Sequence, residues 1–361
     1  MKYSIRNILL APFTVLYSLI TSTRNILYDK GFLKSTSFEI PTISVGNLAV
    51  GGTGKTPHVE YLINLLKKDF TVGVLSRGYK RKTKGFILAT NNTNSHEIGD
   101  EPYQIYQKNT DIVVAVDEKR VHGVSELCNL HQNLGVILLD DALQHRQIKA
   151  GLSILLTDYG HLFTRDYHLP SGNLRESKNG SRRADIIIVT KCPDYMSGTK
   201  MKQVELELNI APHQSLFYSK YEYADILPVF ENEELKHWKL KELNDLNIGI
   251  LALAGIVHPG AFLKHLQRFS VNCEGLFFPD HHSFQEKDIQ SVIKKFKNMK
   301  SSDSIIIVTE KDASRIESNP KAWETLKLKL YKLPIKVKIL KNEELLINKI
   351  YDYARNNSRN N

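Results

Sequence analysis

Short apolar runs recur along the first half of the chain, separated by stretches whose apolar residues follow a helical spacing. The runs are rich in β-branched residues and are apolar throughout rather than alternating; they cover residues 38–45, 71–76, 111–116, 136–139, 152–157 and 185–190. The stretches between them that we expect to be helical include residues 59–66, 103–108 and 119–130. Apolar strands of this kind are typical of parallel sheets that are covered by helices on both faces. The pattern therefore predicts an α/β fold with a mostly parallel, doubly wound sheet.

The pattern is interrupted after residue 196 and then resumes. Residues 196–240 carry more charge, and residues 216–223 alternate like a strand with two different faces. A second α/β pattern follows, with strands expected at 248–256, 271–278, 304–308 and 335–339 and helices at 260–269, 286–297 and 345–353. We therefore expect a second, smaller α/β domain. The expected segments are an N-terminal helix (1–30), a large domain (31–215), a linker strand region (216–230), the smaller domain (231–334), and a returning linker strand with a closing helix and a frayed tail (335–361).

The N-terminal segment has the composition of a helix that lies on a membrane. Residues 7–23 contain no charge and include Pro12, and their 17 residues would span roughly 25 Å as a helix, short of a hydrocarbon core of roughly 30 Å. No small-residue cleavage site of a secretory signal follows. We expect an uncleaved helix in the membrane interface, although a helix packed on the protein's own core would share this pattern. The cations expected to face anionic headgroups are Lys2, Arg6, Arg24, Lys30 and Lys34.

Length, charge and cysteine usage narrow the class of protein. A chain of 361 residues is long for a single core. The formal net charge of +10 suits a nucleic acid, an anionic membrane or a phosphorylated substrate, and does not choose among them. The three cysteines are far apart and form no Cys-x-x-Cys pair, which argues against a disulfide framework or a zinc site and favours a reducing cytosol.

A glycine-rich loop lies between the first expected strand and the first expected helix. Residues 45–57 read Val-Gly-Asn-Leu-Ala-Val-Gly-Gly-Thr-Gly-Lys-Thr-Pro, with Ala49 where a P-loop usually has its first glycine. In such a loop backbone N–H groups surround phosphate oxygens, the lysine adds a point charge, and the threonine hydroxyl can ligate Mg²⁺. An ordinary strand-to-helix turn is the alternative. The residues expected to bind nucleotide are Val50, Gly51, Gly52, Thr53, Gly54, Lys55 and Thr56.

Carboxylates follow two other expected elements. Asp140 and Asp141 end the apolar run 136–139, as in a Walker B strand, whose acid holds the Mg²⁺ that bridges the β- and γ-phosphates. Asp100 lies in Gly-Asp-Glu-Pro at the start of a helix, where acidic residues are also common as caps. A basic cluster, residues 77–82, ends another strand, at the edge where open α/β sheets bind ligands.

Three classes of nucleotide-dependent protein compete for this pattern. A switch GTPase would carry Asp-x-x-Gly after the acidic strand and Asn/Thr-Lys-x-Asp later, whereas Asp140 is followed by Asp-Ala-Leu, and Asp194 lies one place too far from Lys191. A membrane-bound regulatory ATPase would fit the N-terminus but leaves His281 unexplained. A kinase for a membrane-borne acceptor would use all of these features.

In their order along the chain, these motifs resemble the tetraacyldisaccharide 4'-kinases, the lipid A 4'-kinases of Gram-negative bacteria. The resemblance rests on residues 46–57, Ser-Arg-Gly-Tyr at 76–79, Gly-Asp-Glu-Pro at 99–102, residues 140–146, 169–176, Asp-His-His at 280–282 and Thr-Glu-Lys-Asp at 309–312. It implies transfer of the ATP γ-phosphate to the 4'-hydroxyl of a tetraacyldisaccharide 1-phosphate, which forms lipid IVA. It further implies a P-loop NTPase core and a smaller domain joined by two strands, with the active site between them.

The resemblance also implies roles for single residues and for partners. Asp100 resembles the family's proposed base for the sugar hydroxyl, and His281 the histidine that partners it from the second domain. Arg175 resembles a phosphate-facing cation, and Asp140, Asp141 and Glu176 the acids around Mg²⁺; with Thr56 these three acids form the expected metal set, and Asp141 and Arg175 join the expected catalytic set. ATP and Mg²⁺ are the implied cofactors. We expect a monomer without nucleic acid, attached peripherally to the cytoplasmic face of the bacterial inner membrane, where it meets its lipid disaccharide.

Overall fold

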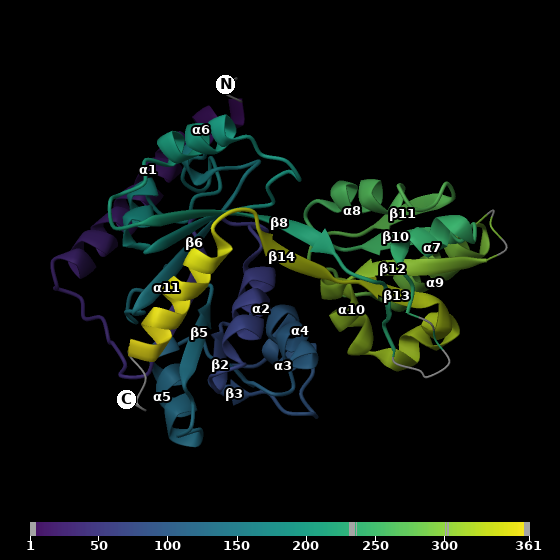
Figure 1. Cartoon of the computed structure of the whole chain (residues 1–361), viewed down its shortest axis with the longest axis horizontal. Coiled ribbons are helices and arrows are strands. Elements are labelled where there is room, and N and C mark those ends of the chain that lie inside the picture. The colour runs from purple at the N-terminus through teal and green to yellow at the C-terminus, as the bar shows by residue number, and fades with distance from the viewer. Residues whose placement is uncertain (1–4, 231–234, 236, 300, 302, 357–361) are drawn as a thin grey trace.

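The molecule consists of two lobes, each built on its own sheet (Figure 1). The structure, a computed structural model, describes residues 5–230, 235, 237–299, 301 and 303–356, with residues 5–8 described by backbone only. Lys2, the side chain of Arg6 and the extreme ends of the two outermost expected segments lie outside this description. The first sheet has the strand order β14-β8-β7-β6-β1-β5-β2-β4-β3, and the second has the order β11-β10-β12-β13-β9.

The larger lobe contains the doubly wound sheet that the sequence predicts. All neighbouring strands from β8 to β4 in this order are parallel, and only the two edge strands, β14 and β3, are antiparallel. The strands are β1 (Thr42–Asn47), β2 (Val72–Ser76), β3 (Ile87–Leu88), β4 (Val113–Val116), β5 (Val136–Asp140), β6 (Leu152–Asp158), β7 (Ile186–Thr190), β8 (Ser215–Tyr223) and β14 (Ile335–Ile339). The helices are α1 (Ile5–Asp29), α2 (Lys55–Leu66), α3 (Ser95–Ile98), α4 (Asp100–Lys108), α5 (Arg120–Leu130), α6 (Gly198–Leu208) and α11 (Glu343–Asn356), with short 3-10 helices η1 (Phe163–Arg165) and η2 (Lys178–Arg183).

Helices cover both faces of this sheet, which explains why its strands are apolar throughout. Side chains of one strand face opposite ways in alternation: Leu138 of β5 joins the core under α2, α4 and α11, and its neighbours Ile137 and Leu139 join the core under α5. Further along the same second face, Leu155 and Ile187 pack against α6. The expected fold class is confirmed.

The smaller lobe repeats the same construction. Its strands are β9 (Leu227–Pro228), β10 (Gly249–Ala254), β11 (Cys273–Phe277), β12 (Ser304–Thr309) and β13 (Leu330–Leu333). Its helices are α7 (Leu240–Asp245), α8 (Pro259–Leu266), α9 (Glu286–Lys297), α10 (Glu310–Glu317) and the 3-10 helix η3 (Pro320–Lys329). One face of β10 and β12 packs on α8, and the other packs on α9, α10 and Trp323, which is 1% exposed.

Two neighbouring strands connect the lobes. β8 and β14 pair antiparallel from Ser219↔Ile339 to Tyr223↔Ile335 at one edge of the large sheet. Pro334 alone separates β14 from β13 of the small sheet, and β8 leads within a few residues to β9. We infer that these two strands are the linker between the two domains.

Some element boundaries differ from the sequence prediction. β1 begins at Thr42 rather than at residue 38, because Pro41 has no N–H to donate and β1 is a central strand between β5 and β6. α10 was not predicted as a helix, yet Thr309 caps it by accepting a hydrogen bond from the Asp312 N–H. The apolar N-terminal run belongs to a helix of 25 residues, longer than its uncharged part.

An ion triad with two buried carboxylates joins the lobes. Lys108, at the end of α4, lies 2.5 Å from Glu60 of α2 and 2.6 Å from Glu310 of α10. Gln104 donates a further hydrogen bond to Glu60 (2.8 Å). Burial raises the pKa of Glu60 to about 7 despite the neighbouring Lys108. One ammonium group therefore ties the helix that follows the loop to the second lobe.

We expect the Lys108→Ala substitution to lower the free energy of unfolding by about 3 kcal/mol at pH 8, because it strands two buried carboxylates. The loss should be smaller at pH 6, since Glu60 can then take up a proton instead of remaining an unpaired charge. Urea denaturation at both pH values measures it. The control is Lys202→Ala, whose partner Glu205 is exposed and whose loss should cost less than about 1 kcal/mol. Equal losses for the two variants would contradict the triad's role.

Candidate active site

The glycine-rich loop connects β1 to α2, and its backbone conformation requires glycine where the helix begins. Gly54 has φ +91°, and a Cβ placed there would lie 1.8 Å from the Tyr221 hydroxyl. No side chain caps the start of α2. The first N–H groups of a helix have no intrahelical partner, so those at Lys55 and Thr56 are available to an anion.

Not all of the expected loop residues have a free backbone amide. The Val50 N–H donates to the Asn173 carbonyl (2.8 Å), and the Thr53 N–H donates to Gly51 (3.0 Å). Gly51 and Gly52 are exposed, and a Cβ at either would meet nothing within 4 Å. The open part of the loop is therefore its glycine segment together with the first turn of α2.

Polar side chains hydrogen-bond the carbonyl groups of the loop. Thr190 donates to the Thr53 carbonyl (2.8 Å), and Lys191 donates to the Gly52 carbonyl. The His58 ring contacts the Gly54 carbonyl (2.7 Å) and the Ser219 hydroxyl (2.9 Å), and burial lowers the pKa of His58 to about 4. A neutral imidazole thus holds the loop by hydrogen bonds without adding charge.

Four polar side chains from different parts of the chain meet beside the glycine-rich loop. Lys55 Nζ lies 3.8 Å from Asp141, and Arg175 forms a two-pronged hydrogen bond to the same carboxylate (2.9 and 3.0 Å). Asn47, at the end of β1, accepts from both Lys55 (3.4 Å) and Arg175. Burial opposes ionisation of Asp141, but Lys55 and Arg175 outweigh it and lower the pKa of Asp141.

The neighbouring Asp140 has the opposite electrostatics. Its carboxylate is 1% exposed and accepts one hydrogen bond, from Ser76 (3.0 Å), while its Oδ1 has no hydrogen-bond partner in the described part of the chain. Burial, with Glu101 and Asp141 nearby, raises the pKa of Asp140 to about 7. A cation would stabilise a buried carboxylate oxygen that accepts no hydrogen bond and has other carboxylates nearby.

The expected metal set is only partly assembled. Within the described ranges, no three His, Cys, Asp or Glu side chains converge as a metal site. Mg²⁺ bound with a nucleotide needs only one or two carboxylates, since phosphates and water complete its shell. Asp140, and Thr56 in the first turn of α2, therefore still fit the ion.

The Glu176 carboxylate is engaged by side chains outside this group. It is fully buried and accepts from Asn25 (3.0 Å), Gln144 (3.1 Å) and Arg183 (2.7 and 2.8 Å). Both of its oxygens are therefore engaged, while its neighbour Arg175 faces Asp141. Glu176 holds the loop 169–176 in place against α1.

A second group of charges lies where α4 meets the smaller lobe. Asp100, at the start of α4, contacts His281 Nδ1 (3.2 Å) and accepts from Arg315 Nε of α10 (2.8 Å). Burial opposes ionisation of Asp100, but the hydrogen bond with His281 and the Arg315 guanidinium outweigh it and lower the pKa of Asp100 to about 2. The next residue, Glu101, is among the charges that raise the pKa of Asp140, so the first turn of α4 borders both groups.

The structure thus brings Asp100 together with His281, and Lys55 with Asp141 and Arg175. Sequence reasoning missed Arg315, and it gave Lys311 no role. Both lie in or just after the motif at residues 309–312, and their spacing of four residues places them on one helix face. That spacing was the available signal.

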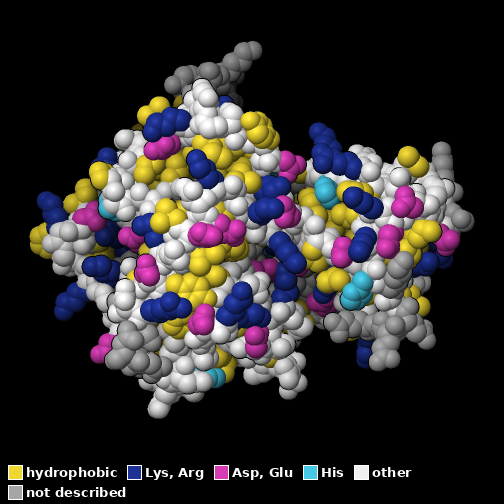
Figure 2. Space-filling model, in the orientation of Figure 1, with side chains coloured by type: hydrophobic (Ala, Val, Ile, Leu, Met, Phe, Trp, Pro, Cys, Tyr) yellow, Lys and Arg dark blue, Asp and Glu magenta, His cyan; other side chains and the backbone are white. Residues whose placement is uncertain are grey.

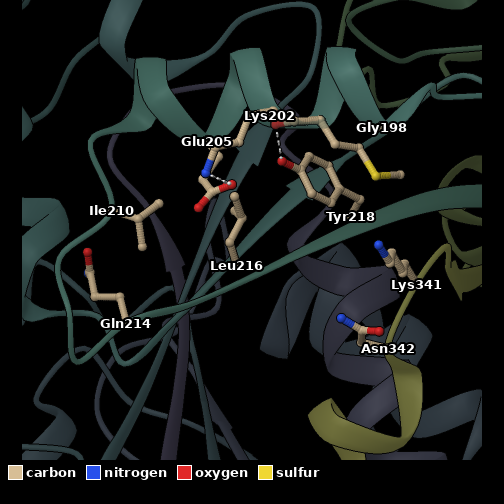
Figure 3. Close-up of a pocket in the computed structure, with 10 residues that line it drawn as sticks. Gly198, Lys202, Glu205, Ile210, Gln214, Leu216, Tyr218, Lys341 and Asn342 are labelled. Atoms are coloured by element: carbon tan, nitrogen blue, oxygen red, sulfur yellow. Dashed lines mark hydrogen bonds and ion pairs between the residues drawn. The ribbon is translucent and has the colours of Figure 1, made fainter.

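Charged side chains lie at the surface where the lobes meet (Figure 2), whereas a hollow lies elsewhere in the molecule. On the face shown in Figure 2, the outline narrows between the lobes, and cationic and anionic side chains are mixed without one continuous basic patch. A hollow of about 410 Å³ lies between α6 and β8, lined by Met201, Tyr218 and Lys341 among others (Figure 3). None of the candidate site residues lines it.

Comparisons with known proteins identify one family. The family model described as tetraacyldisaccharide-1-P 4'-kinase matches residues 6–353. The tetraacyldisaccharide 4'-kinase of Bacteroides thetaiotaomicron is 44% identical over 361 aligned residues, which cover 97% of this chain and 94% of that protein. The enzyme of the same name from Bacteroides fragilis is 46% identical over 354 residues, with the same shares covered. A crystal structure of LpxK from Aquifex aeolicus, an "apo" form in complex with ATP, superposes with a TM-score of 0.74 at 31% identity, covering 97% of this chain and 99% of that one.

We expect Asp140→Asn to weaken binding of the magnesium–nucleotide complex by about 10- to 100-fold, because it removes the charge from the unpartnered oxygen. Binding of nucleotide in EDTA should change little. The ligand-free protein should be no less stable, and could gain about 1 kcal/mol, since a buried charge is removed. Calorimetric titration and thermal denaturation measure these effects. Asp111→Asn, at an exposed carboxylate, is the control; equal effects on both would contradict a metal role for Asp140.

Proposed function

The chain belongs to the tetraacyldisaccharide-1-phosphate 4'-kinase family, and on this premise we propose how its residues carry out the reaction. The chain is a phosphotransferase that moves the γ-phosphate of ATP to the 4'-hydroxyl of a tetraacyldisaccharide 1-phosphate, a step of lipid A biosynthesis that yields lipid IVA. The observation that supports the residue assignments is the contact between Asp100 of the larger lobe and His281 of the smaller lobe, which pairs a carboxylate with an imidazole across the two lobes.

Cations and backbone N–H groups bind the triphosphate in this proposal. The exposed glycines and the first turn of α2 receive phosphate oxygens, and Lys55 provides a charge beside them. Arg175, held by Asp141 and Asn47, faces the transferred group. Asp140 and Thr56 would hold Mg²⁺, which would neutralise charge on the phosphates. Asp141 keeps the Lys55 and Arg175 side chains in place.

Asp100 orients the acceptor hydroxyl. Because its pKa is lowered to about 2, it is a carboxylate at any working pH and accepts a hydrogen bond from the sugar alcohol. Such a weak base suits phosphoryl transfer, whose loose transition state asks mainly for orientation of the nucleophile. His281 holds the carboxylate in position.

The acceptor is a lipid, and α1 offers a surface for a membrane. Large apolar side chains of α1 are exposed, among them Phe13 (63%), Leu16 (56%) and Leu19 (63%). Thr14 contacts Ser171 (2.6 Å), and Tyr17 donates to the Arg175 carbonyl (2.9 Å). Of the helices described here, none has the length and apolarity needed to cross a bilayer. We propose that α1 lies in the interface of the cytoplasmic face of the inner membrane, with Arg24, Lys30 and Lys34 toward the headgroups.

We expect purified protein to transfer label from ATP to the disaccharide acceptor, and Asp100→Asn to reduce this transfer by about 10²-fold or more. ATP binding to the variant should remain, because Asp100 does not contact the loop. Thin-layer chromatography follows the lipid product, and calorimetry follows nucleotide binding. Full activity in the variant would remove Asp100 as the base. Strong ATP hydrolysis without a phosphorylated lipid would instead indicate a membrane-bound regulatory ATPase.

We expect the double substitution Leu16→Glu and Leu19→Glu to weaken binding to anionic vesicles by about 100-fold or more, since each apolar side chain loses its favourable burial. Vesicle sedimentation measures the effect. Val271→Glu is the control, because Val271 is an even more exposed apolar residue (86%) on the other lobe. Unchanged sedimentation of the double variant would refute the membrane role of α1.

A further inference from the structure

Two cations of α10 reach the pair of residues that is proposed to activate the acceptor. Lys311 and Arg315 lie one turn apart, and α10 packs against α4, which carries Asp100 at its start. Lys311 Nζ lies 2.9 Å from His281 Nε2, and Arg315 Nε lies 2.8 Å from Asp100 Oδ2. His281 and Asp100 therefore each have their own cation, and both cations lie on one face of α10.

The contact with Lys311 defines the tautomer of His281. An ammonium group can only donate, so His281 Nε2 must accept and cannot carry a proton. The proton of a neutral imidazole is then on Nδ1, which lies 3.2 Å from Asp100 Oδ2 and can donate to it. Asp280 is 3.7 Å from Nε2, too far for a hydrogen bond that would compete with Lys311.

The backbone reinforces this arrangement. His281 is in the left-handed region, with φ +59°, a conformation that costs a non-glycine residue energy and that clusters at functional sites. The Tyr79 ring packs edge-on against the imidazole, with centroids 5.3 Å apart. The backbone conformation and the packing of the Tyr79 ring both restrict the orientation of the imidazole.

Hydrogen bonds within the smaller lobe hold the Arg315 side chain in place. Its Nη1 donates to Asp312 Oδ1 (2.7 Å) and to the Gly255 carbonyl (3.1 Å). Asp312 is fully buried, and its other oxygen accepts from the Gly255 N–H (3.0 Å) and the Thr309 hydroxyl (2.6 Å). The guanidinium is therefore fixed before it meets Asp100.

These contacts occupy only one oxygen of Asp100. Oδ2 receives both His281 and Arg315, whereas no group in the described part of the chain hydrogen-bonds Oδ1. Asp100 is partly exposed, so an incoming hydroxyl can reach Oδ1. Two further carboxylates neighbour Lys311: Glu101 at 3.5 Å and Asp280 at 3.3 Å.

We propose that Lys311 and Arg315 are positioning residues for acceptor activation: Lys311 keeps His281 in the Nδ1-protonated tautomer, and Arg315 fixes Asp100 Oδ2, so that Oδ1 faces the sugar hydroxyl. The inference rests on the proposed role of Asp100. It gives the motif at residues 309–312 a function in the chemistry beyond the packing of α10. It also means that the activating pair is complete only while α10 lies against α4.

The tautomer can be tested directly on the unaltered protein. In ¹⁵N-histidine-labelled protein, with His281→Gln used for assignment, we expect His281 to show a protonated Nδ1 and an unprotonated Nε2. In Lys311→Met this pattern should give way to a mixture of tautomers. A protonated Nε2 in the unaltered protein would overturn the proposal, whether or not any variant folds.

Kinetics test the consequence for catalysis. We expect Lys311→Met and Arg315→Met to lower kcat by about 10- to 100-fold, the scale of a misplaced reacting group, with KM for ATP nearly unchanged. In the unaltered protein Asp100 stays ionised over the working pH range, whereas in Arg315→Met kcat should fall at the acidic end of that range, because the guanidinium that favours the ionised Asp100 is gone and the pKa of Asp100 rises. Arg315→Lys, which keeps the charge, should restore part of this shift.

The matched control is Lys332→Met. Lys332 pairs with Glu317 (2.9 Å), which lies on α10 like Lys311 and Arg315, and Lys332 touches neither Asp100 nor His281. If the three methionine variants share one kcat and one pH profile while Asp100→Asn is inactive, the positioning role is refuted and the proposed function stands. If Asp100→Asn is fully active, the proposed base fails whatever the tautomer of His281.

Discussion

Buried charge in this protein is neutralised by partners that other elements supply, often from the opposite lobe. Lys108 neutralises Glu60 of the larger lobe and Glu310 of the smaller one, and Arg315 crosses to Asp100. An unpaired buried charge would cost several kcal/mol, so these pairs hold α4 and α10 together. These pairs therefore fix α10 of the smaller lobe against α4, the helix that carries Asp100.

Beside the glycine-rich loop, two adjacent carboxylates have opposite properties. Asp141 lies between two cations and is held in its charged form, whereas Asp140 is enclosed, has one oxygen without a donor and resists ionisation. Environment rather than residue type makes this division. One acid can therefore organise cations of the protein, while the other is left for a cation that arrives with the nucleotide.

The backbone is strained at the same places. Asp141, Lys191 and His281 all have positive φ values, +49°, +55° and +59°, and each contributes a side chain to the site or to the support of its loop. Such conformations are retained where the surrounding structure compensates for them. Here the compensation is the set of ion pairs and hydrogen bonds that each side chain makes.

The sequence by itself determined the parallel sheet, its coverage by helices, the glycine-rich loop and the carboxylates at the end of β5. It also predicted α9 and β14 to the residue. These features depend on apolar periodicity, capping and turn chemistry, which act between residues close in the chain. The residue at which β1 begins is also determined locally, by the neighbouring Pro41. Only the tertiary structure decided that Glu176 binds Arg183 rather than facing the loop, and that Lys311 and Arg315 meet His281 and Asp100. The partners of Asp100 lie about 200 residues away in sequence, and the identity of such a partner is set by how two separately folded sheets dock, which no local pattern encodes.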